Sequence, residues 1–290
     1  MAYLCDMRST LAVLRKYDIR LQKRFGQNFL INPVVPEEIV AAAELTKEDT
    51  VLEIGPGIGT MTQYLAEAAG RVVAVEVDKK LPVILSDTLS EYDNVTVINE
   101  DILKVDIAEA CALGGGERIK VVANLPYYIT TPILMKLLED DSRKLMESIT
   151  VMVQKEVAER MCTGPGSKAY GALSLAVNYY ADAQITATVG PECFVPRPNV
   201  ESAVVKLRIY DEPPVVCEDP ARMFALIRAA FNQRRKTLSN ALSHDASLGT
   251  SREDVCGALG VMGLKDTARG EELSLQQFAE LSDILKASEV

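Results

Sequence analysis

The sequence lacks tryptophan and contains a single histidine, His244, among its 290 residues. With only one histidine, a histidine-rich metal site is excluded, and so is any catalytic scheme built on a histidine other than His244. We expect His244 to lie at the surface or at a helix end. The six cysteines are far apart and form neither a CxxC pair nor a metal-ligand spacing, which indicates reduced thiols and no bound metal.

Long apolar runs are also absent. No stretch reaches the roughly 20 residues that a membrane-spanning helix needs, and Asp6 and Arg8 interrupt the N-terminal region where a signal peptide would have its apolar core. The composition, 48% hydrophobic and 25% charged, is ordinary for a globular protein. The sequence therefore predicts a cytoplasmic protein with no membrane contact, and its length suits one large domain plus a small one.

Basic residues do not dominate the chain, whose net charge is −10. The total argues against a nucleic-acid partner, because counterion release from phosphates usually requires a basic balance. The distribution argues otherwise, since residues 222–244 contain no acidic side chain and include Arg234, Arg235 and Lys236. A second basic cluster has only Asp18 opposing it and comprises Arg15, Lys16, Arg20, Lys23 and Arg24. Each cluster is either a solvated helix face or an RNA contact, and we favour RNA contact.

Short apolar segments alternate with segments of helical periodicity from residue 50 onward. Five of them predict parallel strands at residues 50–54, 72–75, 94–98, 119–123 and 148–153, and two more, at 184–189 and 202–210, resemble a hairpin that closes the sheet. Near-continuous apolar strands indicate a sheet covered by helices on both faces. We predict an α/β fold with a Rossmann-like, mostly parallel sheet of seven strands.

A linker with two adjacent prolines, Asp211-Glu212-Pro213-Pro214, follows the last of these strands. Beyond it, residues 220–242, 252–262 and 274–287 have helical periodicity. We therefore predict a catalytic domain of residues 1–212 and a small α-helical domain of residues 213–290.

A glycine-rich loop, Gly55-Pro56-Gly57-Ile58-Gly59, follows the first strand. Glycine allows a tight turn and a close approach to a ligand at the N-terminus of the next helix. A dinucleotide site would have a third glycine where Thr60 stands, whereas the spacing Glu53-x-Gly55-x-Gly57-x-Gly59 is typical of S-adenosylmethionine enzymes. Glu76 ends the second strand and is placed to accept both ribose hydroxyls, although it would serve NAD equally well.

Other polar residues also fall at the carboxyl ends of the predicted strands, where parallel α/β sheets bind ligands. Asp101 follows the third strand and could accept a hydrogen bond from an adenine amino group, with Ile102 packing on the ring. Asp101 could equally cap a helix.

The turn Asn124-Leu125-Pro126-Tyr127 follows the fourth strand and discriminates best between functions. The amino group of a purine is a poor nucleophile, because its lone pair is delocalised into the ring. Asn124 Oδ1 and the Leu125 carbonyl offer two acceptors that would localise this lone pair, and Tyr127 would stack on the base. Together with the glycine loop, this turn predicts methyl transfer to a base amine.

The run Phe194-Val195-Pro196-Arg197-Pro198-Asn199-Val200-Glu201-Ser202 opens the last strand. Its prolines would stiffen the loop and hold Phe194, which is either a core residue or a cover for the second face of the base. Arg197 in the same loop is a candidate RNA contact.

Several of these motifs together resemble the rRNA adenine N6,N6-dimethyltransferase family along nearly the whole chain. They are Gln27-Asn28-Phe29-Leu30, the glycine loop, the Asn124 turn and the Phe194 run. Two further segments, Ser167-Lys168-Ala169-Tyr170-Gly171 and residues 231–238, are similar to the branch acting on small-subunit (16S) rRNA. Leu125 stands where DNA adenine enzymes of this type usually carry proline, which favours an RNA substrate.

The resemblance implies a class I S-adenosylmethionine-dependent methyltransferase that dimethylates two adjacent adenosines in the 3′-terminal hairpin loop of 16S rRNA, within the immature small subunit. Asn28 and Leu30, in an N-terminal extension of residues 1–30, would close over the methionine end of the cofactor. The cofactor contacts it implies are Asn28, Leu30, Gly55, Gly57, Glu76, Asp101, Ile102 and Asn124. The catalytic set is Asn124, Leu125, Tyr127 and Phe194, and the RNA contacts are Arg234, Arg235, Lys236, Lys168 and Arg197.

The implied chemistry is direct in-line displacement, which relies on positioning and desolvation rather than a strong base. We expect a monomer, with the ribosomal particle supplying part of the recognition that an acidic protein lacks. Three alternatives stay open: a sister enzyme acting on large-subunit rRNA, an NAD-dependent oxidoreductase, and a non-enzymatic assembly factor that retains the fold.

Overall fold

The computed structural model describes residues 3–19, 28–115 and 118–287. The expectations for Arg20, Lys23, Arg24 and Gln27 fall outside the described residues. The chain divides into two compact units. The first comprises Met1–Ala158 and Ala183–Ile209, and the second comprises Glu159–Asp182 and Tyr210–Val290.

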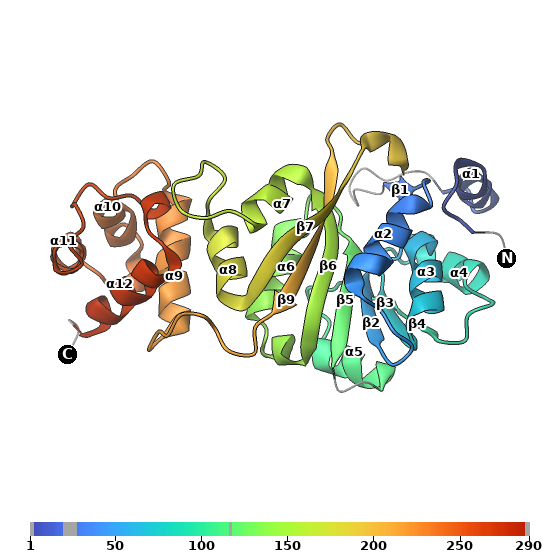
Figure 1. Ribbon diagram of the computed structural model, residues 1–290, viewed down its shortest axis with the longest axis horizontal. Helices are drawn as coiled ribbons and strands as arrows, with labels where there is room; N and C mark the ends of the chain where they lie inside the picture. Colours follow the sequence, from blue (N-terminus) through green and yellow to red (C-terminus); the bar gives the residue numbers. More distant parts are fainter. Residues whose placement is uncertain (1–2, 20–27, 116–117, 288–290) are drawn as a thin grey trace. The chain divides into compact units, whose positions relative to one another are not determined.

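The first unit is built on a seven-stranded sheet with the strand order β4-β3-β2-β5-β6-β9-β7 (Figure 1). Strands β2 to β6 pair in parallel, and β9 runs antiparallel to β6. The prediction of a mostly parallel, seven-stranded sheet is confirmed. The strands are β2 (Thr50–Ile54), β3 (Arg71–Val75), β4 (Val95–Ile98), β5 (Ile119–Asn124), β6 (Met146–Gln154), β7 (Ala181–Val189) and β9 (Ser202–Ile209).

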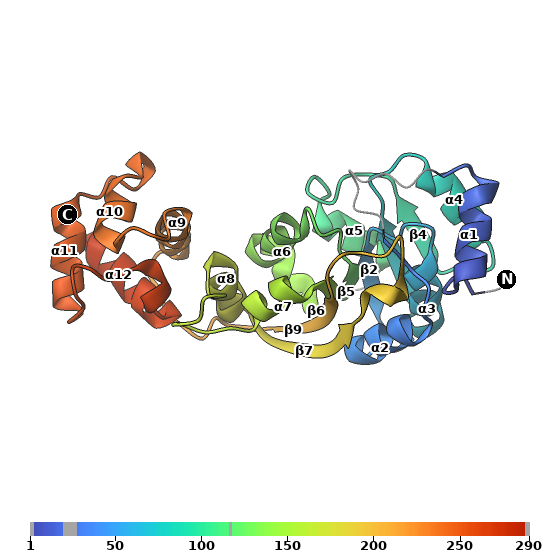
Figure 2. The same cartoon turned by 90° about the horizontal axis from the view of Figure 1, so that it is seen from above.

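Helices cover both faces of this sheet, with α2 and α3 on one face and α5 and α6 on the other (Figure 2). All five residues of β2 are buried, as are the first five of β5, because strands sandwiched between helices have no solvent face. The helices are α1 (Met7–Lys16), α2 (Val34–Ala43), α3 (Thr60–Ala68), α4 (Leu81–Thr88), α5 (Ile107–Gly114), α6 (Thr130–Glu139) and α7 (Lys155–Met161).

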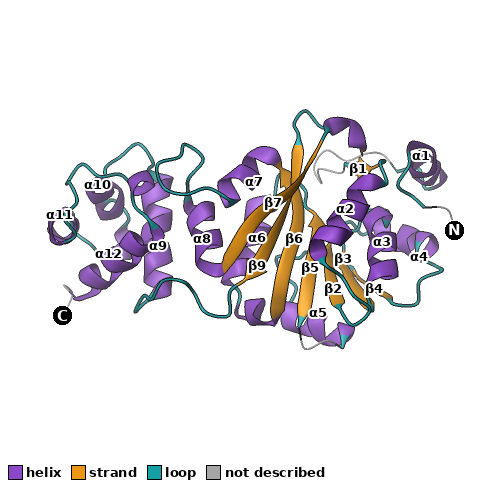
Figure 3. Ribbon diagram, viewed as in Figure 1, coloured by secondary structure: helices purple, strands orange, loops and turns teal. Residues whose placement is uncertain are grey.

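A separate two-stranded ribbon pairs β1 (Phe29–Leu30), which Figure 3 labels, with β8 (Phe194–Val195). The strands are antiparallel, with Leu30 opposite Phe194, and the Ile31 amide donates to the Cys193 carbonyl over 2.9 Å. This pairing was not expected from the sequence, because two-residue strands show no periodicity. The ribbon brings the N-terminal motif and the Phe194 loop together.

The second unit is helical, with α8 (Ala172–Tyr180), α9 (Pro220–Asn232), α10 (Leu238–Ser243), α11 (Arg252–Val261) and α12 (Leu275–Ala287). The continuous helix expected at residues 220–242 is interrupted at 233–237, and Thr237 caps the start of α10. The Tyr180 ring stacks on Phe224 with centroids 5.5 Å apart. Residues 159–182, placed in the first domain by the sequence analysis, therefore group with the second unit, and the last division lies at 209/210 rather than 212/213.

Over the described residues, no helix combines the length and apolar content that crossing a membrane would require. All six cysteines lie in the described part of the chain, and none of them forms a disulfide bond. His244 is exposed at the C-terminal end of α10, where its Nδ1 lies 2.7 Å from the Asn240 carbonyl oxygen. The expectation of a surface or helix-end histidine is confirmed.

Candidate cofactor and catalytic site

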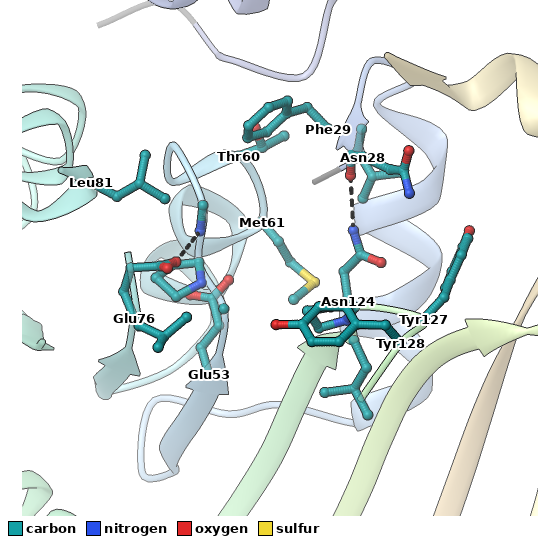
Figure 4. Close-up of a pocket in the computed structure, with 17 residues that line it drawn as sticks. Asn28, Phe29, Glu53, Thr60, Met61, Glu76, Leu81, Asn124, Tyr127 and Tyr128 are labelled. Atoms are coloured by element: carbon teal, nitrogen blue, oxygen red, sulfur yellow. Dashed lines mark hydrogen bonds between the residues drawn. The ribbon is translucent and has the colours of Figure 1, made fainter. Parts of the chain in front are cut away.

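A cavity lies at the carboxyl ends of β2, β3 and β5 (Figure 4). Its volume, including the open mouth, is about 790 Å³, which is within the range of sites for small molecules and cofactors. The lining comes from residues 28–30, the glycine loop and the start of α3, the end of β3, and residues 124–128. Segments that are far apart in the sequence thus meet where a doubly covered parallel sheet binds ligands.

The glycine loop has a backbone that only glycine adopts readily. Gly55, Gly57 and Gly59 have φ angles of +71°, +62° and +92°, in the left-handed region where a Cβ causes strain. A Cβ on Gly55 would project into open space, whereas one on Gly57 would lie 3.3 Å from the Phe29 ring. The backbone at Gly55 is therefore open to a ligand, while Phe29 packs closely on Gly57.

Glu76 is held in place at the end of β3. Its Oε2 accepts from the Gly57 amide over 3.1 Å and its Oε1 accepts from the Asp78 amide over 2.8 Å. Burial raises the pKa of this carboxyl, while the Asp78 and Gly57 amides counteract the rise. Each carboxylate oxygen has a second lone pair, so Glu76 can also receive the two hydroxyls of a ribose at this edge of the cavity.

Glu53 lies deeper in the same wall and is only 1% exposed. Neither carboxylate oxygen has a hydrogen-bond partner among the described residues. Burial raises the pKa of Glu53 to about 8, and the charge of Glu76 adds to this rise. The nearby Thr62 hydroxyl lowers the pKa in part, although its geometry falls short of a hydrogen bond. From the sequence, Glu53 defines the glycine spacing and falls at a strand end where ligands bind, but its burial without a partner leaves no mark in the sequence.

The turn after β5 places Asn124 at the cavity. Its Nδ2 donates to the Asn28 carbonyl over 3.4 Å (Figure 4), which leaves Oδ1 as the side-chain atom for a hydrogen-bond donor. The Leu125 amide donates to the Met152 carbonyl over 3.0 Å, and the Thr130 hydroxyl donates to the Pro126 carbonyl over 3.0 Å. The turn is therefore anchored to β6 on one side and to α6 on the other.

Two tyrosines line the cavity: Tyr127, which ends this turn, and Tyr128, which follows it. The Tyr127 hydroxyl lies 2.6 Å from the Ser202 hydroxyl at the start of β9. Burial raises the pKa of Tyr127, and the bond to Ser202 opposes the rise. Tyr128 is 56% exposed and was not singled out from the sequence. A large aromatic so exposed beside a cavity is a signal that only the structure gives.

Of the predicted cofactor and catalytic residues, three do not line the cavity: Asp101, Ile102 and Phe194. Asp101 Oδ1 accepts from the Leu103 amide over 3.0 Å, so it caps a turn, close to the alternative role considered from the sequence. Ile102 is 6% exposed and Phe194 is 2% exposed. Phe194 belongs to the same core cluster as Leu30, and this burial matches the core alternative rather than a cover for a base.

The predicted RNA contacts differ in their surroundings. Arg234 donates from Nε to Glu271 over 2.8 Å and from its terminal nitrogen to the Lys168 carbonyl over 2.7 Å. It therefore ties together two segments of the helical unit. Arg235 and Lys236 are exposed. The side chain of Arg197 is 69% exposed, with its guanidinium 3.9 Å from the Glu192 carboxylate.

Comparison with protein families agrees with the resemblance seen in the motifs. The sequence model of the family described as "Ribosomal RNA adenine dimethylase" matches residues 19–286. A protein of Lachnoclostridium phytofermentans named "Ribosomal RNA small subunit methyltransferase A" is 58% identical over 287 residues, 98% of each chain. A protein of Alkaliphilus metalliredigens with the same name is 49% identical, covering 94% of each chain.

Solved structures give the same picture. A dimethyladenosine transferase from Plasmodium falciparum superimposes with a TM-score of 0.69 at 25% identity, covering 87% of this chain and 95% of its own. The 23S rRNA methyltransferase ErmE superimposes with a TM-score of 0.64 at 26% identity, covering 89% of this chain and 100% of its own.

Proposed function

The chain belongs to the ribosomal RNA adenine dimethylase family, and we propose that its substrate is 16S rRNA of the immature small subunit, where it dimethylates two adjacent adenosines in the 3′-terminal hairpin loop. It is an S-adenosylmethionine-dependent enzyme with the Rossmann-like fold of class I methyltransferases. The observation that carries the chemistry is the anchored Asn124 turn beside the glycine loop. The relatives named for the small subunit favour 16S over large-subunit rRNA, since ErmE is only 26% identical.

The groups that line the cavity suit the binding of S-adenosylmethionine. A loop of positive-φ glycines allows close approach, two backbone amides hold the Glu76 carboxylate where it would receive the ribose hydroxyls, and Glu53 adds a second, unpartnered carboxyl to the same wall. When bound, the cofactor supplies a methyl group on a positively charged sulfur. Asn28 and Leu30 would close over its methionine end with Gly55 beneath it, and Asn124 would lie between cofactor and target. Gly57, Asp101 and Ile102 remain proposed cofactor contacts, the last two at the adenine.

The residues after β5 would make the adenine amine nucleophilic. Asn124 Oδ1 and the Leu125 carbonyl would accept its two N–H groups, which draws the nitrogen toward tetrahedral geometry and localises the lone pair. Tyr127 would stack on the base, and its bond to Ser202 holds the ring in one position. Phe194 as a second stacking partner requires the side chain to leave the core, so Tyr127 is the stronger candidate.

Rate enhancement would come from positioning and from excluding water. Among the residues that the structure describes, the side chains lining the cavity include no histidine or lysine that could act as a base. The amine nitrogen becomes acidic once it carries the new methyl group, so its proton can leave to water after transfer. The site must then accept the monomethylated amine, which still has one N–H for Asn124 or Leu125.

The helical unit and the exposed basic residues would contact the ribosomal particle. Arg235 and Lys236 are exposed, Arg197 is largely so, and Lys168 is held near Arg234. A net charge of −10 makes tight binding to naked RNA unfavourable, so the assembled particle would supply part of the recognition. We propose a monomer acting in the cytoplasm, where small subunits are assembled.

The test is transfer of labelled methyl from S-adenosylmethionine to small subunits that lack the modification, with large subunits in parallel. Label recovered as dimethyladenosine in 16S rRNA alone supports the proposal. Label in large-subunit RNA alone would assign the chain to the sister activity. Cofactor binding without label in either particle would overturn the substrate assignment and leave an assembly role.

A further inference from the structure

The glycine loop does not fix its own shape. Gly57 and Gly59 flank Ile58 with φ angles of +62° and +92°, and glycine adopts many backbone conformations at little steric cost. A peptide group between two such residues rotates easily, so contacts from outside the loop must hold it in the shape that receives a ligand. The bond from the Gly57 amide to Glu76 is one such contact. A second comes from residues that do not line the cavity.

Thr88, the last residue of α4, holds the peptide group between Ile58 and Gly59. Its hydroxyl donates to the Ile58 carbonyl over 2.9 Å, and both residues are buried. The next residue also fits closely, since a Cβ on Gly59 would lie 3.2 Å from the Thr88 hydroxyl oxygen and 3.1 Å from Leu89. The end of α4 therefore fixes the middle of the loop and the residue that caps the start of α3.

Gln63, a buried residue of α3, connects Thr88 to the N-terminal segment of residues 3–19. Its side-chain nitrogen donates to the Thr88 carbonyl over 3.3 Å, and its side-chain oxygen accepts from the Leu4 amide over 3.0 Å. The Thr10 hydroxyl of α1 donates to the Leu4 carbonyl over 2.8 Å. A continuous series of buried hydrogen bonds thus runs from the N-terminal segment through Gln63 and Thr88 to Ile58 of the glycine loop.

Apolar packing joins the same elements. Leu4 and Leu14 of the N-terminal segment share a buried cluster with Ile58 of the glycine loop and with residues of α4. Phe29, which packs on Gly57 in the cavity wall, belongs to this cluster too. Figures 1 and 2 both show α1 beside α4. Release of the N-terminal segment would therefore remove both the hydrogen bonds and the packing that support the loop.

We propose that the N-terminal segment stabilises the cofactor-binding shape of the glycine loop, and that Gln63 and Thr88 are the positioning residues through which it acts. Neither side chain lines the cavity, so both act through the loop. Coupling between two equilibria is reciprocal, so bound cofactor must in turn hold the N-terminal segment more tightly. The inference rests on the cofactor assignment in the proposed function, but it does not depend on which RNA is methylated.

Calorimetric titration of the full-length protein with S-adenosylmethionine tests the contact with the loop. Thr88→Val keeps the shape of the side chain and removes the hydroxyl, so it should raise the dissociation constant about five- to tenfold. Thr88→Ser keeps the hydroxyl and should stay within about threefold of wild type. Wild-type affinity in Thr88→Val would overturn the proposal.

Thr50→Val is the matched control for a purely structural effect. The buried Thr50 hydroxyl also donates to a backbone carbonyl, that of Gly114, over 3.2 Å, but it does so at the start of β2. This variant should lower the melting temperature about as much as Thr88→Val does and leave the dissociation constant within about twofold of wild type. An equal loss of affinity in the two variants would reduce Thr88 to a contributor to stability.

Amide hydrogen exchange tests the N-terminal segment itself. Saturating S-adenosylmethionine should slow exchange in α1 more than in α5, which belongs to the same unit. Gln63→Met keeps the side-chain length without the two hydrogen bonds, so it should abolish this extra protection of α1. Equal protection of α1 and α5 in the wild type would refute the proposal, and that comparison needs no variant. A failed rRNA assay with both binding results intact would instead count against the proposed substrate.

Discussion

The side-chain nitrogen of Asn124 donates to the backbone carbonyl of Asn28 over 3.4 Å. This bond joins the turn after β5 to the N-terminal motif, which in turn pairs through Leu30 with the Phe194 strand. It also determines which way the Asn124 amide faces, because an oxygen in place of the nitrogen would meet another acceptor. Oδ1 is thereby left for the amine of the target adenine.

The carboxylate of Glu76 should determine cofactor affinity. Replacing Glu76 with alanine removes both proposed ribose contacts and also releases the amides of Gly57 and Asp78. We expect the dissociation constant of S-adenosylmethionine to rise by about 100-fold, since hydrogen bonds to a charged group contribute about 1.5–3 kcal/mol each. Calorimetric titration measures this directly. An unaltered constant would remove Glu76 from the ribose site.

The buried Glu53 should reduce the stability of the cofactor-free protein as pH rises. Its pKa is about 8 in the folded chain against an ordinary value of 4.5, so the folded state keeps a proton that the unfolded state loses between these values. The contribution of Glu53 to the free energy of unfolding is therefore fully present below pH 4.5 and decreases as pH rises towards 8. At pH 7 about 3 kcal/mol of it has been lost. Glu53→Gln should raise the free energy of unfolding at pH 7 and flatten its dependence on pH in urea titrations. A variant less stable than wild type at pH 7 would contradict this.

The hydroxyls of Tyr127 and Ser202, 2.6 Å apart, should act as one unit. Tyr127→Phe and Ser202→Ala should each lower the free energy of unfolding by about 1 kcal/mol, because each leaves a partly or fully buried partner unpaired. The double variant should cost less than the sum of the two. Strictly additive losses in a denaturation cycle would show that the two groups do not interact.

Of the basic residues after α9, Arg235 and Lys236 should contact RNA, whereas Arg234 should mainly hold the helical unit together. Replacing Arg235 and Lys236 together with alanine should weaken binding to small subunits and reduce the slope of log affinity against log salt by about 1.5, if each contacts one phosphate. Arg234→Ala is the matched control, because its side chain is engaged with Glu271 and Lys168. It should lower stability by no more than about 1 kcal/mol and change the salt slope less. An unchanged salt slope in the double variant would show that Arg235 and Lys236 are solvent-exposed residues that do not contact RNA phosphates.

The parts of the fold that the sequence predicts are those fixed by local pattern. The strand Thr50–Ile54 was predicted to the residue, because a continuous apolar run ends at glycines. The glycine loop and the Asn124 turn follow such strands, and the parallel topology alone brings their ends together. These features needed no knowledge of side-chain packing.

The features that could not be predicted from the sequence depend on tertiary contacts. The grouping of Ala172–Tyr180 with the helical unit follows from aromatic packing on Phe224. Sequence periodicity does not show which distant segment a helix packs against. Phe194 was expected beside the base but lies in the core, since its pairing with Leu30 is a contact between distant segments. The isolation of Glu53 is likewise a property of its surroundings and not of its neighbours in sequence.

The central claim is that Asn124 acts on the target amine, and one comparison tests it most directly. Wild type and Asn124→Ala would be compared for methyl transfer to unmodified small subunits, with the S-adenosylmethionine dissociation constant measured on the same preparations. We predict that transfer falls by about 100-fold or more, while the dissociation constant changes by a much smaller factor. Near-normal transfer by Asn124→Ala would contradict the account, and a loss explained entirely by weaker cofactor binding would reduce Asn124 to a cofactor contact.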